Sequence, residues 1–305
     1  MPNLSSSHVA SLPRPIASPS MALREDGTAF IVGSGIQSYR PGAPVTDIHG
    51  PSDDHPVECG VTIDGDVLTT YGGHPEGDEY AALDEISTFS AATGEATDVD
   101  ARRLPFPRRG ICAVRHGKKA VLFGGISTDG HPSRDIVVVS PGQPIRALKA
   151  LLGVSCAYLQ AGASKPGGTP VVFLLGSGAQ DWQPPKKGYD LMVSKPGDVV
   201  FSELFPALQG SPRIGVTVIQ KDAETFYSFG GADGNGGVSS KLYRHFNGGT
   251  DEVGDVIGPD GQPYRVCYAA GIFAENAIHL IGGLAGSPYS STSTATDKIV
   301  KVSLA

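Results

Sequence analysis

The segment VLFGG at residues 121–125 indicates the fold because its pattern recurs along the chain. Six apolar runs end in a glycine pair or in Gly-Ser-Gly: FIVGSG at 30–35, TTYGG at 69–73, VLFGG at 121–125, FLLGSG at 173–178, YSFGG at 227–231 and HLIGG at 279–283. Their first glycines, at 33, 72, 124, 176, 230 and 282, are spaced by 39, 52, 52, 54 and 52 residues. A period near 50 residues predicts one structural unit used six times within a single domain spanning residues 1–305.

The third repeat shows the predicted unit most clearly. It contains four short, largely apolar segments at residues 109–115, 120–123, 135–139 and 144–149. Turn signals separate them, among them His116-Gly117 and Pro141-Gly142. Four short strands joined by turns predict an antiparallel meander. No repeat carries a long pattern with the 3.6-residue period of a helix, so we expect an all-β protein.

The two ends of the chain complete the repeat pattern. Residues 297–304 (DKIVKVSL) resemble the third strand of the sixth repeat, and no fourth strand follows them. At the other end, residues 7–12 (SHVASL) precede Pro13-Arg14 in the same way that residues 102–106 precede Pro107-Arg108. We therefore expect the N-terminal segment to supply the missing strand of the last repeat and to cover an exposed sheet edge.

These features resemble the kelch repeat family. The shared motifs are the apolar-Gly-Gly stop, a preceding Pro-Arg pair (Pro107-Arg108, Pro212-Arg213) and a third strand that begins with Asp135-Ile136. The resemblance implies a six-bladed β-propeller with four-stranded antiparallel blades around a central channel, with the N-terminal strand closing the last blade. It also implies that the channel mouth is a binding surface for acidic peptide segments or small acids.

Composition excludes several classes of partner. The net charge is −7 with no Lys/Arg-rich run, so we expect no nucleic-acid binding. No apolar stretch approaches the roughly 20 residues of a membrane span, and no secretory signal is visible. Cysteines occur at positions 59, 112, 156 and 267 without a CxxC motif, which favours a reducing, cytoplasmic location. We expect these thiols to pack in inner strands rather than to bind a metal.

Candidate site residues lie in two sets of loops that share one end of the blades. The loops after the second strands carry His74, His131 and Trp182, and the segments before the first strands carry Arg14, Arg109, Arg213, Tyr264 and Arg265. Guanidinium groups are rigid forks that fit carboxylates, so several arginines around one mouth predict an anion site. The sequence contains no GxSxG, HExxH or P-loop motif, and we expect neither a metal nor a cofactor.

Two functions are compatible with these residues. The first is a binding module for an acidic peptide or a small carboxylate-containing ligand, with Arg109, Arg213 and Arg265 at its centre. The second is a cofactor-independent isomerase, cyclase or lyase, in which His74 or His131 transfers a proton and an arginine holds an anionic group. Purely structural roles remain open: arginines paired with carboxylates of neighbouring blades, histidines in surface turns, and Trp182 covering apolar surface.

Overall fold

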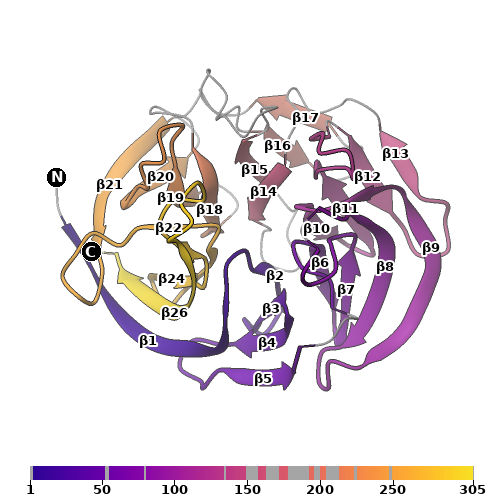
Figure 1. Ribbon diagram of the computed structural model, residues 1–305, viewed down its shortest axis with the longest axis horizontal. Coiled ribbons are helices and arrows are strands. Elements are labelled where there is room, and N and C mark those ends of the chain that lie inside the picture. Colours follow the sequence, from indigo (N-terminus) through magenta and orange to yellow (C-terminus); the bar gives the residue numbers. More distant parts are fainter. Residues whose placement is uncertain are drawn as a thin grey trace. The chain divides into compact units, whose positions relative to one another are not determined.

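The computed structural model describes residues 3–51, 55–78, 80–133, 135–148, 157–162, 172–177, 192–195, 200–203, 213–222, 225–246 and 249–304. Within these residues every regular element is a β-strand (Figure 1). No helix in this part of the chain is long and apolar enough to cross a membrane. The chain divides into two compact units: unit 1 comprises Met1–Ser18, Gln160–Ser177 and Gln183–Ala305, and unit 2 comprises Pro19–Leu159 and Gly178–Trp182.

Unit 2 contains three antiparallel sheets, each built from four consecutive strands. The first sheet has the order β2(Ser20–Leu23)-β3(Ala29–Gly33)-β4(Gly35–Tyr39)-β5(Thr46–His49). The second sheet has the order β6(Gly60–Asp64)-β7(Val67–Tyr71)-β8(Leu83–Ser90)-β9(Ala96–Arg108). The third sheet has the order β10(Cys112–His116)-β11(Lys119–Phe123)-β12(Ile136–Val139)-β13(Arg146–Leu148). The third sheet contains all four strands that the sequence predicts there, although the first begins at Cys112 rather than at Arg109.

The remaining strands form a four-stranded and a ten-stranded sheet. The four-stranded sheet has the order β14(Ala157–Gly162)-β15(Val172–Ser177)-β16(Met192–Lys195)-β17(Val200–Glu203). The main path of the ten-stranded sheet is β18(Ile214–Gln220)-β19(Thr225–Ala232)-β20(Lys241–Phe246)-β21(Gly249–Ile257)-β1(Asn3–Ile16)-β26(Thr294–Ser303)-β24(Ala277–Ile281)-β23(Ala270–Ala274). Off this path, β22(Val266–Cys267) pairs with β25(Leu284–Ala285), and β25 also pairs with β26.

Strand β1 joins two parts of this sheet. Its residues from Ser6 to Ile16 pair antiparallel with β26, so the predicted pairing between the two ends of the chain is observed. Its first residues, from Asn3 to Ser5, pair parallel with β21, which the sequence did not predict. The Ser6 hydroxyl strengthens that second pairing by donating a 2.6 Å hydrogen bond to the Ile257 carbonyl. Because β1 lies between β21 and β26, it covers the edges of both strands.

Glycine pairs redirect the chain at the end of the second strand in the four repeats that carry them, at residues 72–73, 124–125, 230–231 and 282–283. Gly72 and Gly73 have φ values of +59° and +100°, a left-handed region that favours glycine. The Gly72 amide donates a 2.8 Å hydrogen bond to the Glu85 carbonyl on the third strand of the same sheet. The Gly73 amide donates a 2.7 Å bond to the Arg108 carbonyl at the end of β9. The chain therefore leaves the sheet at this turn, and the amides of both glycines remain hydrogen-bonded to neighbouring strands.

The first repeat departs from this arrangement, and the difference explains its short spacing. Gly33 pairs directly with Gly35, so β3 passes into β4 through Ser34 alone. The loop that follows the second strand in the other sheets of unit 2 is therefore missing here. This short link accounts for the spacing of 39 residues between the first two glycine stops.

Apolar side chains from neighbouring sheets of unit 2 pack face to face. Phe30 and Val32 of the first sheet share a buried cluster with Val61, Leu68 and Phe89 of the second sheet. Alternate residues of a strand point to opposite faces, so each central strand contributes to the clusters on both of its sides. Burial of one such side chain contributes about 1.5–3 kcal/mol, which makes these layers the main source of stability.

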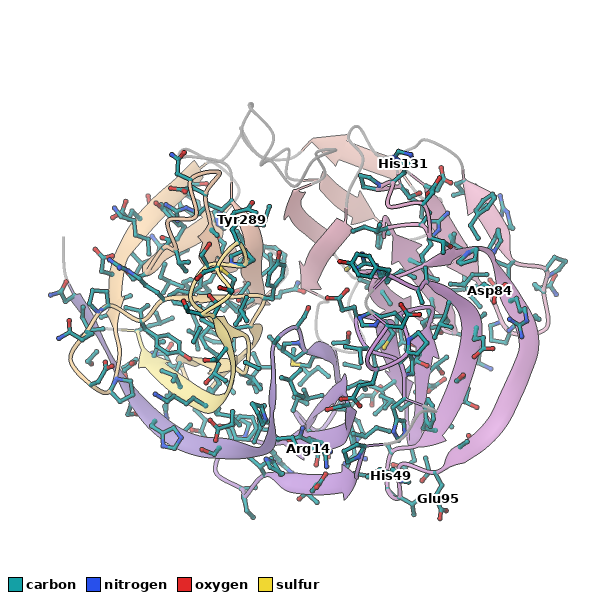
Figure 2. The ribbon with its side chains drawn as sticks, in the orientation of Figure 1. Arg14, His49, Asp84, Glu95, His131 and Tyr289 are labelled. Carbon is teal, nitrogen blue, oxygen red and sulfur yellow. The ribbon has the colours of Figure 1, made fainter. Side chains whose placement is uncertain are left out.

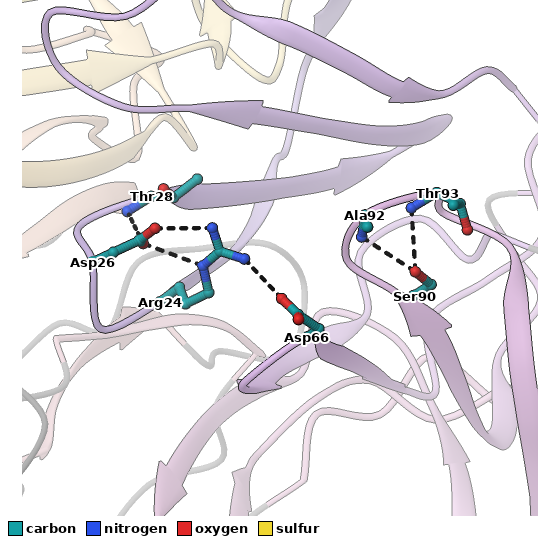
Figure 3. Close-up of polar contacts among 7 residues, drawn as sticks. All are labelled: Arg24, Asp26, Thr28, Asp66, Ser90, Ala92 and Thr93. Atoms are coloured by element: carbon teal, nitrogen blue, oxygen red, sulfur yellow. Dashed lines mark hydrogen bonds and ion pairs between the residues drawn. The ribbon is translucent and has the colours of Figure 1, made fainter.

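A polar contact links the outer turns of the first two sheets (Figure 3). The Arg24 guanidinium donates a 3.0 Å hydrogen bond to Asp66 in the β6–β7 turn and also binds Asp26 in its own turn. The hydrogen bond from Arg24 holds the pKa of the Asp26 carboxyl well below its usual range. Because these groups are largely exposed to solvent, the contact contributes little to stability.

Unit 1 contains a buried polar chain across β19, β20 and β21. The Nε2 atom of His245 lies 2.7 Å from the Ser228 hydroxyl oxygen, and its Nδ1 atom lies 3.0 Å from the Thr250 hydroxyl oxygen. The imidazole is buried, with 2% of its residue surface exposed. Both ring nitrogens therefore have hydroxyl partners in a region that disfavours a charged ring.

We expect His245 to make the stability of the protein fall as the pH drops. Burial lowers the pKa of His245 to about 4, whereas an unfolded chain has a histidine pKa of about 6.5. Between these values the unfolded state binds a proton that the folded state does not, so stability present above pH ~6.5 is lost toward pH ~4. The loss amounts to about 3 kcal/mol. Urea unfolding between pH 7 and 4 should show a flatter dependence for His245→Gln, and an unchanged dependence would contradict the assignment.

Candidate functional site

Three polar side chains of unit 2, Glu58, His74 and Arg109, form a compact group that we call the Glu58 cluster. One oxygen of Glu58, Oε2, lies 3.4 Å from Nη1 of Arg109 and 3.7 Å from Nε2 of His74. The exposed fractions of the side chains are 17% for Glu58, 11% for Arg109 and 9% for His74. Two predicted site residues, His74 and Arg109, are therefore brought together by a carboxylate that the sequence analysis did not single out.

Backbone hydrogen bonds position the three residues of the cluster. His74 follows the Gly72-Gly73 turn and exchanges two 2.9 Å backbone bonds with Val57, the residue before Glu58. The Gly110 amide donates a 2.7 Å bond to the Glu58 carbonyl, which places Arg109 beside the same segment. The loop after a second strand and the segments before two first strands therefore meet here, as alternating strand direction predicts.

Glu58 has a backbone conformation that is uncommon for a residue with a side chain. Its φ is +54°, and Gly110, which bonds to it, has a φ of +62°. Unit 1 repeats the arrangement: Gly215 and Tyr268 have φ values of +66° and +57°, and the Tyr268 amide donates a 2.7 Å bond to the Gly215 carbonyl. The left-handed conformation costs a non-glycine residue of order 1 kcal/mol, and such residues concentrate at functional sites.

The hydrogen bonding of His74 defines how its ring can act. Its Nδ1 atom lies 2.8 Å from the carbonyl oxygen of Pro75, which can only accept a hydrogen bond. Nδ1 therefore carries a proton, and Nε2 is the nitrogen that faces Glu58. A neutral ring presents a lone pair on Nε2, and a protonated ring presents an N–H toward the carboxylate. The ring is therefore oriented with Nε2, rather than Nδ1, toward the carboxylate of Glu58.

Arg108, next to the cluster in sequence, has a structural environment. Its Nη1 donates a 3.1 Å hydrogen bond to the Gly124 carbonyl, and its Nη2 lies 3.3 Å from Oδ2 of Asp135. The side chain is buried, and desolvation lowers the pKa of its guanidinium while Asp135 opposes that effect. Arg108 therefore ties the end of β9 to the third sheet, whereas Arg109 reaches the Glu58 cluster.

His131 lies in a surface turn between β11 and β12, where Figure 2 labels it. Its side chain is 65% exposed, and its ring lies 4.0 Å from the carboxylate of Asp129 in the same turn. Ser127 also contacts this carboxylate and donates a 2.9 Å bond to the His131 carbonyl. The polar groups of this turn therefore stabilise it by contacting one another. A catalytic function for His131 stays a prediction.

The predicted residues of unit 1 differ in burial. Arg14 on β1 and Arg213 before β18 are half-buried, and Arg265 is exposed. The ring of Tyr264 stacks on Phe229 with centroids 6.1 Å apart, and burial raises the pKa of its hydroxyl to about 12. Tyr264 therefore packs against the core. Trp182 lies outside the described residues.

The cysteines in the described part of the chain are buried free thiols: Cys59, Cys112 and Cys267. Burial raises the pKa of Cys59 and Cys267 to about 12, which keeps both thiols protonated and unreactive. Cys156 lies outside the described residues. Among the residues that the structure describes, no group of three or more His, Cys, Asp or Glu side chains is arranged to hold a metal ion.

The sheets of consecutive antiparallel strands and the comparison with solved structures fit an all-β protein with a β-propeller-like fold. One solved structure, titled "Structure of YjhT", is similar with a TM-score of 0.77 over 98% of this chain and 97% of the other chain. The two sequences are 14% identical, so the likeness shows the fold alone. No protein-family model matches the sequence. A search of curated proteins also finds no match.

Proposed function

We propose that the chain is a six-bladed, kelch-like β-propeller of the cytoplasm, closed by β1, whose channel mouth binds an acidic peptide or protein segment or a small carboxylate-containing molecule. The repeat period, the glycine pairs and the Pro-Arg pairs support the architecture. The buried free thiols support a reducing compartment. The proposal includes no nucleic-acid or membrane partner.

The Glu58 cluster is the observation that carries the binding function. Arg109 and His74 are two groups capable of positive charge, and both face a single carboxylate oxygen of Glu58. Glu58 itself demonstrates that a carboxylate fits between them. The chain as a whole has a net charge of −7, so this local pair of cation-forming groups distinguishes the cluster from the general surface. A guanidinium held by a folded backbone is preorganised for an acidic ligand.

Calorimetric titration with citrate, acetate and a tetra-aspartate peptide tests this function. We expect at least one of these probes to bind. We expect Arg109→Gln to weaken that binding about 10- to 100-fold, because the substitution removes one charged hydrogen bond to the ligand. Arg103→Gln is the matched control, because Arg103 pairs with Asp84 at an exposed site in the same unit. Equal binding by wild type and Arg109→Gln, or no binding by wild type, would contradict the proposal.

The geometry of His74 favours a second candidate, a cofactor-independent isomerase, cyclase or lyase. In this function His74 transfers a proton through Nε2, Glu58 stabilises the protonated ring, and Arg109 holds an anionic group of the substrate. The 2.8 Å bond between Nδ1 of His74 and Pro75 fixes the ring for such a transfer. Incorporation of deuterium from D2O into an acid that binds, followed by NMR, distinguishes this enzyme from a binding module.

A further inference from the structure

We propose that Glu58 is an internal competitor whose carboxylate occupies the anion position of the site, so that an acidic ligand must displace it from Arg109 and His74. The inference rests on the proposed function, because it concerns the regulation of the same site. It assigns to Glu58 a function opposite to ligand recognition: the residue lowers the affinity for carboxylates and restricts binding to ligands that bind the cluster more strongly than Glu58 does.

The contacts of Glu58 are long enough for a ligand to improve on them. Its carboxylate lies 3.4 Å from Nη1 of Arg109 and 3.7 Å from Nε2 of His74. Charge-assisted hydrogen bonds between such groups usually measure about 2.7–2.9 Å. An untethered carboxylate is free to approach Arg109 at that shorter distance and with two oxygens, whereas the backbone holds Glu58 in place. Exchange of Glu58 for a ligand therefore replaces loose contacts with tighter ones.

Burial indicates which group can move. Among the three side chains, Glu58 has the largest exposed fraction, 17%, against 11% for Arg109 and 9% for His74. Glu58 can rotate toward solvent while the two cation-forming groups remain on their backbone supports. His74 is held through its backbone bonds to Val57, and Arg109 through its own pair of backbone bonds to Ile126. Displacement of Glu58 therefore leaves a binding position that is already assembled.

The backbone conformation of Glu58 allows its side chain to be removed by substitution with glycine. Its φ of +54° suits glycine, and the neighbouring Gly110 has a φ of +62°. Glycine at position 58 would remove strain of order 1 kcal/mol. The hydrogen bond that joins the two segments uses the Glu58 carbonyl and the Gly110 amide, so it does not depend on the side chain. Glu58→Gly is therefore expected to fold and to keep the position of Arg109.

Calorimetric titration with citrate and with a tetra-aspartate peptide tests the competition. We expect Glu58→Gly and Glu58→Gln each to bind these probes about tenfold more tightly than wild type, the size of one charged hydrogen bond. Adding Arg109→Gln to either variant should remove the gain. Glu85→Gln is the matched control: it also removes one negative charge from unit 2, at an exposed ion pair with Arg103, and should change affinity less than twofold.

The outcomes separate the competition from the proposed function. If Arg109→Gln abolishes binding but both Glu58 variants bind as weakly as wild type or more weakly, the site binds carboxylates and Glu58 is not a competitor. If neither wild type nor Glu58→Gly binds any carboxylate, the proposed function fails and the competition fails with it. Binding of citrate by Glu58→Gly alone would support the occupation of the anion position by Glu58, but it would contradict the proposed binding function of the wild-type protein.

Discussion

Replacing Gly72 by alanine is expected to destabilise the protein by about 3–5 kcal/mol. Gly72 has a φ of +59°, which disfavours a side chain. An added Cβ would also lie 2.5 Å from the Arg108 carbonyl oxygen and 3.0 Å from that of Leu83. Both contacts are with backbone atoms, which cannot rotate away as a side chain can. The substitution therefore forces β9 or the start of β8 to move, in addition to straining the turn.

Gly65→Ala is the matched control for this prediction. Gly65 lies in the turn between β6 and β7 of the same sheet, has a φ of +58° and would bring an added Cβ within 4 Å of nothing. The Gly65→Ala substitution therefore has only the conformational cost of the positive φ, which lowers the free energy of unfolding by about 1 kcal/mol. We expect the melting temperature of Gly72→Ala to lie about 3–6 °C below that of Gly65→Ala. Equal melting temperatures would mean that the glycine pairs are needed only for their φ values.

The same contacts explain why the repeat could be predicted from the sequence. The four Gly-Gly pairs have positive φ values and lie close to neighbouring backbone, so glycine persists there as a visible motif. The third strand of the sixth repeat and its pairing with the N-terminal segment were predictable for a similar reason, since both follow the repeat. The parallel pairing of β1 with β21 could not be predicted. It depends on which strand edge lies beside β1 in the folded protein, and it leaves no pattern in the sequence of either strand.

The candidate site was predictable only in part. His74 and Arg109 were found because they occupy loop positions next to recognisable motifs. Glu58 was missed because a single carboxylate beside an apolar strand usually indicates a solvated turn. The available signal was positional: Glu58 and Gly110 are 52 residues apart, the same spacing as the glycine stops, so an acid stands where the next repeat has glycine. Arg108 and Arg109 are adjacent in sequence but differ in their partners: Arg108 contacts Gly124 and Asp135, whereas Arg109 contacts Glu58.

Arg108→Met is expected to lower the free energy of unfolding by about 2–4 kcal/mol. Methionine retains much of the apolar stem but removes the guanidinium that binds the Gly124 carbonyl and the Asp135 carboxylate. The arginine side chain is 5% exposed, so water cannot readily replace it at the Gly124 carbonyl. Asp135 is 21% exposed and regains some hydration, which keeps the expected loss below that of a fully buried pair. Chemical denaturation monitored by circular dichroism measures the change.

Two comparisons show whether burial, rather than charge, causes this loss. Arg103→Met removes an ion pair with Asp84 at a site where the arginine is 61% exposed, and it should cost less than about 1 kcal/mol. In a double-mutant cycle, Asp135→Asn should have a smaller effect when Arg108 is already methionine, because the two side chains contact each other. If Arg108→Met and Arg103→Met proved equally mild, the Pro-Arg pair would not be a structural link between β9 and the third sheet. A function for Arg108 at the site would then account better for an arginine at that position.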